Sequence, residues 1–223
     1  MPRKKIDKIL LITVLVLVAF GVFMVYSSSS VWAQYKFNDS YKFLKNQALF
    51  YILGILGMLI LSKIDYHLYL KKSNLILGIC FILLILVLIP GLGVVRNGSR
   101  SWFGIGSFGI QPSEIAKIGL IIFVSKYLSN NSREMNRIIQ GVLPIFLVIL
   151  VFFILIMLEP DFGTGMVIVL TLVAMIFVSK VKISFFVKLG IVGLMGIVGL
   201  IIVAPYRMAR IVSYLNPWSD PLG

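Results

Sequence analysis

The sequence has few acidic residues, one cysteine and one histidine. Only 8 of its 223 residues are aspartate or glutamate, and charged residues of both signs make up 13% of the chain, about half the share in a typical soluble domain. One cysteine cannot form a disulfide within the chain, and one cysteine with one histidine provides no metal-ligand set. These shortages exclude a soluble cytosolic enzyme, a disordered tail and a secreted disulfide-stabilised domain.

Apolar residues are abundant and occur in long unbroken runs. They account for 60% of the chain, and the mean hydropathy is +1.04. A helix needs about 20 apolar residues to cross a bilayer, whereas a barrel would show alternating segments of about ten residues. The runs predict an all-α fold, a polytopic bundle of transmembrane helices. The seven expected spans are Lys8–Ser27, Asn46–Leu61, Asn74–Ile89, Pro112–Tyr127, Ile138–Leu158, Phe162–Ser179 and Ser184–Ala204.

The 21 lysines and arginines give the chain a net charge of +13. Because they lie mostly in short segments between apolar runs, membrane topology explains them, and we predict no nucleic-acid partner. Basic residues are enriched on the cytoplasmic side of a membrane, and an inside N-terminus places 13 of them inside and 7 outside, with Lys117 within a span. The inner ones are Arg3, Lys4, Lys5, Lys8, Lys63, Lys71, Lys72, Lys126, Arg133, Arg137, Lys180, Lys182 and Lys188, and the outer ones are Lys36, Lys42, Lys45, Arg96, Arg100, Arg207 and Arg210.

Glu114 and Lys117 lie in the first turns of the fourth expected span. Residues three apart share one face of a helix, and a charge near the middle of a membrane costs roughly 2.5–3.5 kcal/mol. Two charges on one face therefore indicate pairing, a water-filled cavity, or both. One interpretation is an ion pair that locks this helix to a neighbour, and the other is the charged lining of a cavity that opens outward.

A short outer turn between the fifth and sixth spans carries Glu159 and Asp161 on either side of Pro160. Two carboxylates this close could orient a sugar hydroxyl, bind a cation or pair with Arg100. The alternative is helix capping, because Asp161 lies where the N-cap of the sixth span is expected.

The outer loop from Val95 to Gln111 combines arginines, aromatic residues and glycines. An arginine such as Arg100 can bind phosphate oxygens with two hydrogen bonds, and Trp102 could stack on a sugar. The alternative is an aromatic belt at headgroup depth.

Several of these segments, in this order along the chain, resemble the SEDS family (shape, elongation, division and sporulation), and its FtsW and SpoVE branch more than RodA. The resemblance covers essentially the whole sequence. The segments are Val25-Tyr26-Ser27-Ser28-Ser29, Asn97-Gly98-Ser99-Arg100-Ser101-Trp102, Gln111-Pro112-Ser113-Glu114 with Lys117, Glu159-Pro160-Asp161-Phe162-Gly163-Thr164, Ala204-Pro205-Tyr206-Arg207 and Tyr214-Leu215-Asn216-Pro217-Trp218-Ser219-Asp220-Pro221.

The resemblance implies a peptidoglycan glycosyltransferase of ten spans that polymerises lipid II at the outer face of the bacterial cytoplasmic membrane, in division or sporulation. It implies as partners a class B penicillin-binding protein transpeptidase, other division proteins and membrane lipids. Residues 1–223 would form one membrane domain that ends within the large outer loop after the seventh span. We therefore expect a fragment that is inactive alone. The family's catalytic aspartate is expected beyond Gly223, and Asp220 should not be mistaken for it.

The expected substrate-binding or cavity-lining residues form one set of charged side chains. They are Arg100, Glu114, Lys117, Glu159, Asp161 and Arg207. A departing lipid pyrophosphate is negatively charged, so a cation in this set could stabilise it. We predict no cofactor, although the chemistry would accommodate a divalent cation. Two other functions stay open: a transporter that flips lipid II, and a non-catalytic scaffold of the division machinery.

Overall fold

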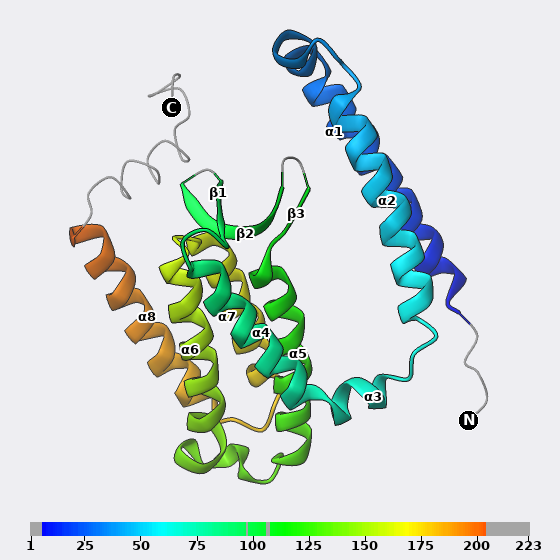
Figure 1. The fold of residues 1–223 in the computed structure, drawn as a ribbon. Coiled ribbons are helices and arrows are strands. Elements are labelled where there is room, and N and C mark those ends of the chain that lie inside the picture. The colour runs from blue at the N-terminus through cyan, green and yellow to red at the C-terminus, as the bar shows by residue number, and fades with distance from the viewer. Residues whose placement is uncertain (1–5, 97, 106–107, 204–223) are drawn as a thin grey trace. The chain divides into compact units, whose positions relative to one another are not determined.

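The computed structural model describes residues 6–96, 98–105 and 108–203 of the chain (Figure 1). Its contacts divide the chain into two units, Met1–Leu68 and Tyr69–Gly223. A short helix, α3 (Tyr66–Lys71), spans the boundary between them. The prediction of one domain over residues 1–223 stays a prediction.

The first unit is a hairpin of two helices, α1 (Lys8–Phe37) and α2 (Lys42–Leu61). The expected end of the first span at Ser27 is wrong for the helix, which continues for ten more residues. The serines do not interrupt it, and the Ser29 hydroxyl donates a hydrogen bond back to the Val25 carbonyl at 2.6 Å. At 1.5 Å per residue, α1 is about 45 Å long, which exceeds the roughly 30 Å hydrocarbon core of a bilayer.

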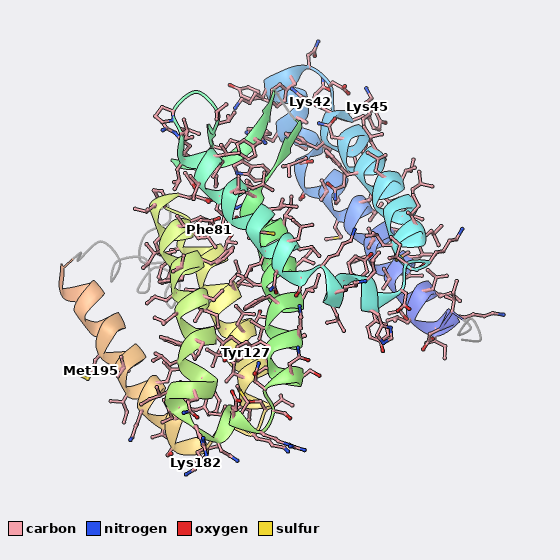
Figure 2. All side chains as sticks on the ribbon, turned by 60° about the horizontal axis from the view of Figure 1, so that its bottom comes forward. Lys42, Lys45, Phe81, Tyr127, Lys182 and Met195 are labelled. Atoms are coloured by element: carbon pink, nitrogen blue, oxygen red, sulfur yellow. The ribbon has the colours of Figure 1, made fainter. Side chains whose placement is uncertain are left out.

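The turn between α1 and α2 gathers aromatic and basic side chains. Trp32 stacks on Phe43 with ring centroids 5.6 Å apart. The Lys42 ammonium lies 3.2 Å from the centroid of the Phe37 ring, and both Lys42 and Lys45 project at this turn in Figure 2. Such a combination is typical of the membrane–water interface.

The second unit is built on four packed helices: α4 (Ser73–Leu88), α5 (Pro112–Asn130), α6 (Leu143–Leu158) and α7 (Phe162–Phe177). A 3-10 turn (Glu134–Asn136) and a π-helical turn (Ile138–Val142) lead into α6. The last helix, α8 (Ile183–Val203), packs its Phe186 against the Phe177 ring at 5.1 Å. The core is mostly aliphatic, and its buried members are Cys80, Leu84, Ala116, Leu120, Val124, Ile145, Ile149, Phe152, Ile156, Ile168, Leu172 and Ile176.

The loop between α4 and α5 folds into a small antiparallel sheet, which the all-α prediction did not include. Its order is β1 (Val94–Arg96), β2 (Ser99–Ile105) and β3 (Phe108–Ile110). Gly98, at the turn between β1 and β2, has a φ of 82°, a conformation that glycine adopts without steric cost. The sheet lies at the end of the bundle opposite the α5–α6 connection (Figure 1).

The predicted helical membrane architecture is confirmed. Helices occur at all seven expected spans, and three candidate spans in the described residues are long and apolar enough to cross a membrane. The number seven remains a prediction.

The ends of the second unit differ in basic charge. Among the described residues, the sheet end carries three basic residues, Arg96, Arg100 and Lys117, and the opposite end carries eight. By the positive-inside rule, this distribution favours the sheet end as the outer one. The eight residues are Lys71, Lys72, Lys126, Arg133, Arg137, Lys180, Lys182 and Lys188.

Candidate functional site

The sheet end of the second unit collects most of the predicted site residues. Here α4 and α6 end, α5 and α7 begin, and β2 contacts both α4 and α5. The elements supply Arg100 from β2, Glu114 and Lys117 from α5, and the turn between α6 and α7. The remaining predicted residue, Arg207, lies outside the described residues.

Glu114 and Lys117 form an ion pair within α5. The Lys117 Nζ atom lies 2.9 Å from both carboxylate oxygens of Glu114. The Lys117 side chain is 25% exposed and the Glu114 side chain is 55% exposed. The helix begins with Pro112, and Glu114 in its first turn suits the positive end of the helix dipole. Because the pair forms within one helix, it does not lock α5 to a neighbour.

Asp161 joins the beginnings of two helices. One carboxylate oxygen accepts a hydrogen bond from the Thr164 backbone N–H at 3.1 Å, which caps α7. The other accepts a hydrogen bond from the Gln111 side-chain amide at 2.7 Å, and Gln111 immediately precedes α5. The capping interpretation of Asp161 is therefore confirmed, and the same carboxylate also fixes the start of α5, three residues before Glu114.

Glu159 is fully buried, and both of its carboxylate oxygens lack a hydrogen-bond partner among the described residues. Burial, with a smaller effect from the nearby Asp161 charge, raises the pKa of Glu159 to about 8. Its carboxyl group is therefore mostly neutral at pH 7. The Ser99 hydroxyl on β2 donates a hydrogen bond to the main-chain carbonyl of Glu159, so this turn contacts the sheet as well as α5.

Arg100 is bound to the end of α4 and forms no ion pair with the α6–α7 turn. Its Nη1 atom donates a hydrogen bond to the Leu88 carbonyl at 3.5 Å. Its Nε atom is buried and has no partner in the described part of the chain. Arg96, on the neighbouring strand β1, lies over the Trp102 ring, 4.9 Å from the centroid, so the sheet brings a basic and an aromatic side chain together.

Three further residues of this end were not among the predicted site residues. Gln111 and Ser99 make the two contacts that join the turn to α5 and to β2, and the hydroxyl of Ser113 is buried without a partner among the described residues. All three lie in the segments that carry the family resemblance, and that resemblance was the one sequence signal that could have identified them. Within the described residues, no group of three or more His, Cys, Asp or Glu side chains is placed to hold a metal ion.

This end therefore combines a half-buried ammonium, a guanidinium with an N–H that has no partner among the residues described, and a network of hydrogen bonds that fixes the elements carrying them. Such a set can bind an anionic group at the membrane surface. The roles of the individual residues remain predictions.

Comparison with known proteins extends the sequence resemblance. Stage V sporulation protein E from Bacillus subtilis (strain 168) is 50% identical over 217 residues, which are 97% of this chain and 59% of that protein. A probable peptidoglycan glycosyltransferase FtsW from Saccharophagus degradans is 38% identical over 97% of this chain and 56% of its own length. The chain thus spans less than two thirds of the length of these curated relatives.

Two solved structures share the fold. A chain from a study entitled "Structural coordination of polymerization and crosslinking by a peptidoglycan synthase complex" is 28% identical, with a TM-score of 0.66 over 92% of this chain and 60% of that one. The rod shape determining protein RodA of Thermus thermophilus is 25% identical, with a TM-score of 0.57 over 80% of this chain and 58% of that one. The family model of FtsW, RodA and SpoVE, described as "Cell cycle protein", matches residues 7–223. The chain therefore belongs to the FtsW/RodA/SpoVE family.

Proposed function

We propose that the protein containing this chain is a peptidoglycan glycosyltransferase that polymerises lipid II at the outer face of the bacterial cytoplasmic membrane. Family membership and the FtsW relatives named as probable peptidoglycan glycosyltransferases support this proposal. The observation that carries it is Lys117, an ammonium in the second turn of α5 at the sheet end. A cation at this depth suits a substrate with a lipid tail and a phosphorylated head.

The reaction places specific demands on the site. Polymerisation forms a bond between a sugar hydroxyl oxygen and the anomeric carbon of a second, lipid-linked disaccharide, whose bond to the pyrophosphate breaks. A base takes the hydroxyl proton, and the lipid pyrophosphate leaves with additional negative charge. Lys117 and Arg100 would stabilise this charge. The α6–α7 turn would fix them through the Asp161–Gln111 and Ser99–Glu159 contacts.

None of the three carboxyl groups described at the sheet end is assigned as the base. Glu114 is ion-paired with Lys117, and Asp161 is occupied by Thr164 and Gln111. Glu159 is fully buried. The resemblance implies that the base lies beyond Gly223, and the proposal adopts this assignment.

The partners are also part of the proposal. The related chain in the peptidoglycan synthase complex favours a class B penicillin-binding protein transpeptidase as the partner. If the protein bound this partner and other division proteins but made no glycan, the scaffold function would replace the enzymatic one.

The test is polymerisation of fluorescent lipid II by the purified protein at its full natural length. We expect Lys117→Gln to reduce glycan synthesis by about 100-fold, the lower range reported for removal of one oxyanion-stabilising group. Lys126→Gln is the matched control, because Lys126 lies on the same helix near its opposite end. Full glycan yield from Lys117→Gln would overturn the assignment of this residue.

A flippase is the second candidate. The π-helical turn Ile138–Val142 and Pro144, in the first turn of α6, make the start of this helix irregular, and irregular helices are a feature of transporters. This function predicts that a labelled lipid headgroup becomes accessible on the opposite side of a liposome without polymerisation. Unchanged headgroup accessibility would exclude it.

A further inference from the structure

A pocket of about 380 Å³ lies at the end of the second unit opposite the sheet. It is bounded by the end of α5, the connection from α5 to α6, and the end of α7. Its floor is largely aliphatic, and Lys180 is the one charged side chain among the described residues that line it. The lining residues are Leu128, Ser129, Ser132, Met135, Met175, Val178, Ser179 and Lys180.

Three serines line the pocket, and the hydroxyl groups of two of them are available to a ligand. The third, Ser179, already donates its hydroxyl hydrogen to the Ile176 carbonyl at 2.5 Å. In the described part of the chain, by contrast, the hydroxyls of Ser129 and Ser132 make no hydrogen bond. Hydroxyl groups and an ammonium that line the same pocket are suitable donors for phosphate oxygens.

The length of α7 indicates how deep the pocket lies. Its 16 residues give a helix of about 24 Å, which is shorter than the roughly 30 Å hydrocarbon core. With Asp161 at the outer surface, the residues that follow α7, Val178 to Lys180, reach the boundary between acyl chains and headgroups on the inner side. Val178 is 86% exposed, which is favourable in lipid and costly in water.

The charge around the pocket favours an anion. This end of the unit carries eight basic residues, including Arg133, Lys180 and Lys182. The acidic residue nearest in sequence to the lining, Glu134, does not line the pocket. A soluble anion would interact with the Lys180 ammonium but not with the aliphatic floor. A phospholipid can interact with both, through its phosphate and its acyl chain.

We propose that this pocket binds one anionic phospholipid of the inner leaflet. Lys180, Ser129 and Ser132 contact its phosphate, and an acyl chain packs along Leu128, Met175 and Val178. This proposal concerns the opposite end of the unit from the candidate site and does not rest on the proposed function. If the proposal holds, the content of anionic phospholipid in the inner leaflet determines how often this pocket is occupied.

The test uses the delipidated protein at its full natural length, titrated in detergent with phosphatidylglycerol, with phosphatidylcholine and with inorganic phosphate. Native mass spectrometry counts the bound lipids. We expect one phosphatidylglycerol to bind more tightly than phosphatidylcholine, and Lys180→Gln to weaken it roughly fivefold, the effect of one juxtamembrane lysine. Lys182→Gln is the matched control, because Lys182 lies at the same end (Figure 2) but outside the pocket.

A second variant tests the aliphatic floor. Met175→Trp is expected to fill the pocket and to remove one bound lipid while the protein keeps its melting temperature. Equal weakening by Lys180→Gln and Lys182→Gln would overturn the proposal in favour of diffuse attraction. Equal binding of phosphatidylcholine, or competition by millimolar phosphate, would overturn it in favour of a non-selective surface or a soluble-anion site.

Discussion

Replacing Glu159 by glutamine removes an ionisable group from a fully buried position in the α6–α7 turn. In the folded protein the pKa of Glu159 is raised from 4.5 to about 8. Below about pH 4.5 the carboxyl group is neutral in the folded and unfolded states, so its ionisation does not affect stability. As the pH rises toward 8, the unfolded state loses the proton while the folded state keeps it, and the folded state becomes less stable relative to the unfolded state.

The size of the change in stability follows from the difference between the folded and unfolded pKa values of Glu159. A full unit of pH between the two pKa values changes the free energy of unfolding by about 1.4 kcal/mol. Because the slope is smaller near each pKa, the total change between pH 5 and pH 8 is about 3–4 kcal/mol. Glu159→Gln abolishes this dependence. A buried glutamine without partners also has a cost of about 1–3 kcal/mol, but that cost does not vary with pH, so the pH dependence is the diagnostic quantity.

The assay is thermal unfolding of the full-length protein and of Glu159→Gln in detergent, from pH 5 to pH 8. We expect the variant to gain in melting temperature relative to the parent as the pH rises. Glu134→Gln is the control, because it makes the same chemical change at an exposed position. A constant difference between parent and Glu159→Gln across this range would refute the reasoning, and so would a gain of the same size in Glu134→Gln.

Two other predictions concern the packing and capping of the second unit. A Cβ atom at Gly119 would lie 2.7 Å from the Cys80 Sγ atom, so Gly119→Ala should destabilise the protein by about 1–3 kcal/mol. Adding Cys80→Ala should restore most of this loss, which a double-mutant cycle of unfolding midpoints measures. The control is Gly78→Ala, where nothing lies within 4 Å of the added Cβ atom, and its unfolding midpoint should not fall. Asp161→Ala should lower the free energy of unfolding by about 2–4 kcal/mol, because it removes the α7 cap and a charge-assisted hydrogen bond. Asp161→Asn, which keeps one acceptor oxygen, should lose less, and equal melting temperatures for both variants would contradict this.

The lengths of the apolar runs predicted most helix boundaries within a few residues, because each helix must satisfy its own backbone hydrogen bonds inside the membrane. The run that includes Ile138–Leu158 did not reveal that its first five residues form a π-helical turn. The end of α1 was also misplaced, since serine is polar without being a helix breaker. The small sheet was missed because its strands are short and lack an alternating apolar pattern.

Local spacing also determined part of the candidate site. The separation of three residues between Glu114 and Lys117 predicted a shared helix face, and the two side chains form an ion pair there. Contacts between residues far apart in sequence were not accessible in this way. The Gln111–Asp161 hydrogen bond joins residues 50 positions apart, and no local pattern specifies which distant donor a carboxylate will accept.

The sequence by itself determined the environment of this chain, its helices, its charge asymmetry and its family, because these depend on composition, on run length and on the order of short motifs. Only the tertiary structure decided that Glu159 is buried with no hydrogen-bond partner for its carboxylate in the described part of the chain, while Asp161, two residues away, caps α7. It also decided that the ends of α5 and α7 enclose a pocket beside Lys180. Burial and enclosure arise from the packing of several helices together, and the energy of a charged group depends on that packing more than on its neighbours in sequence.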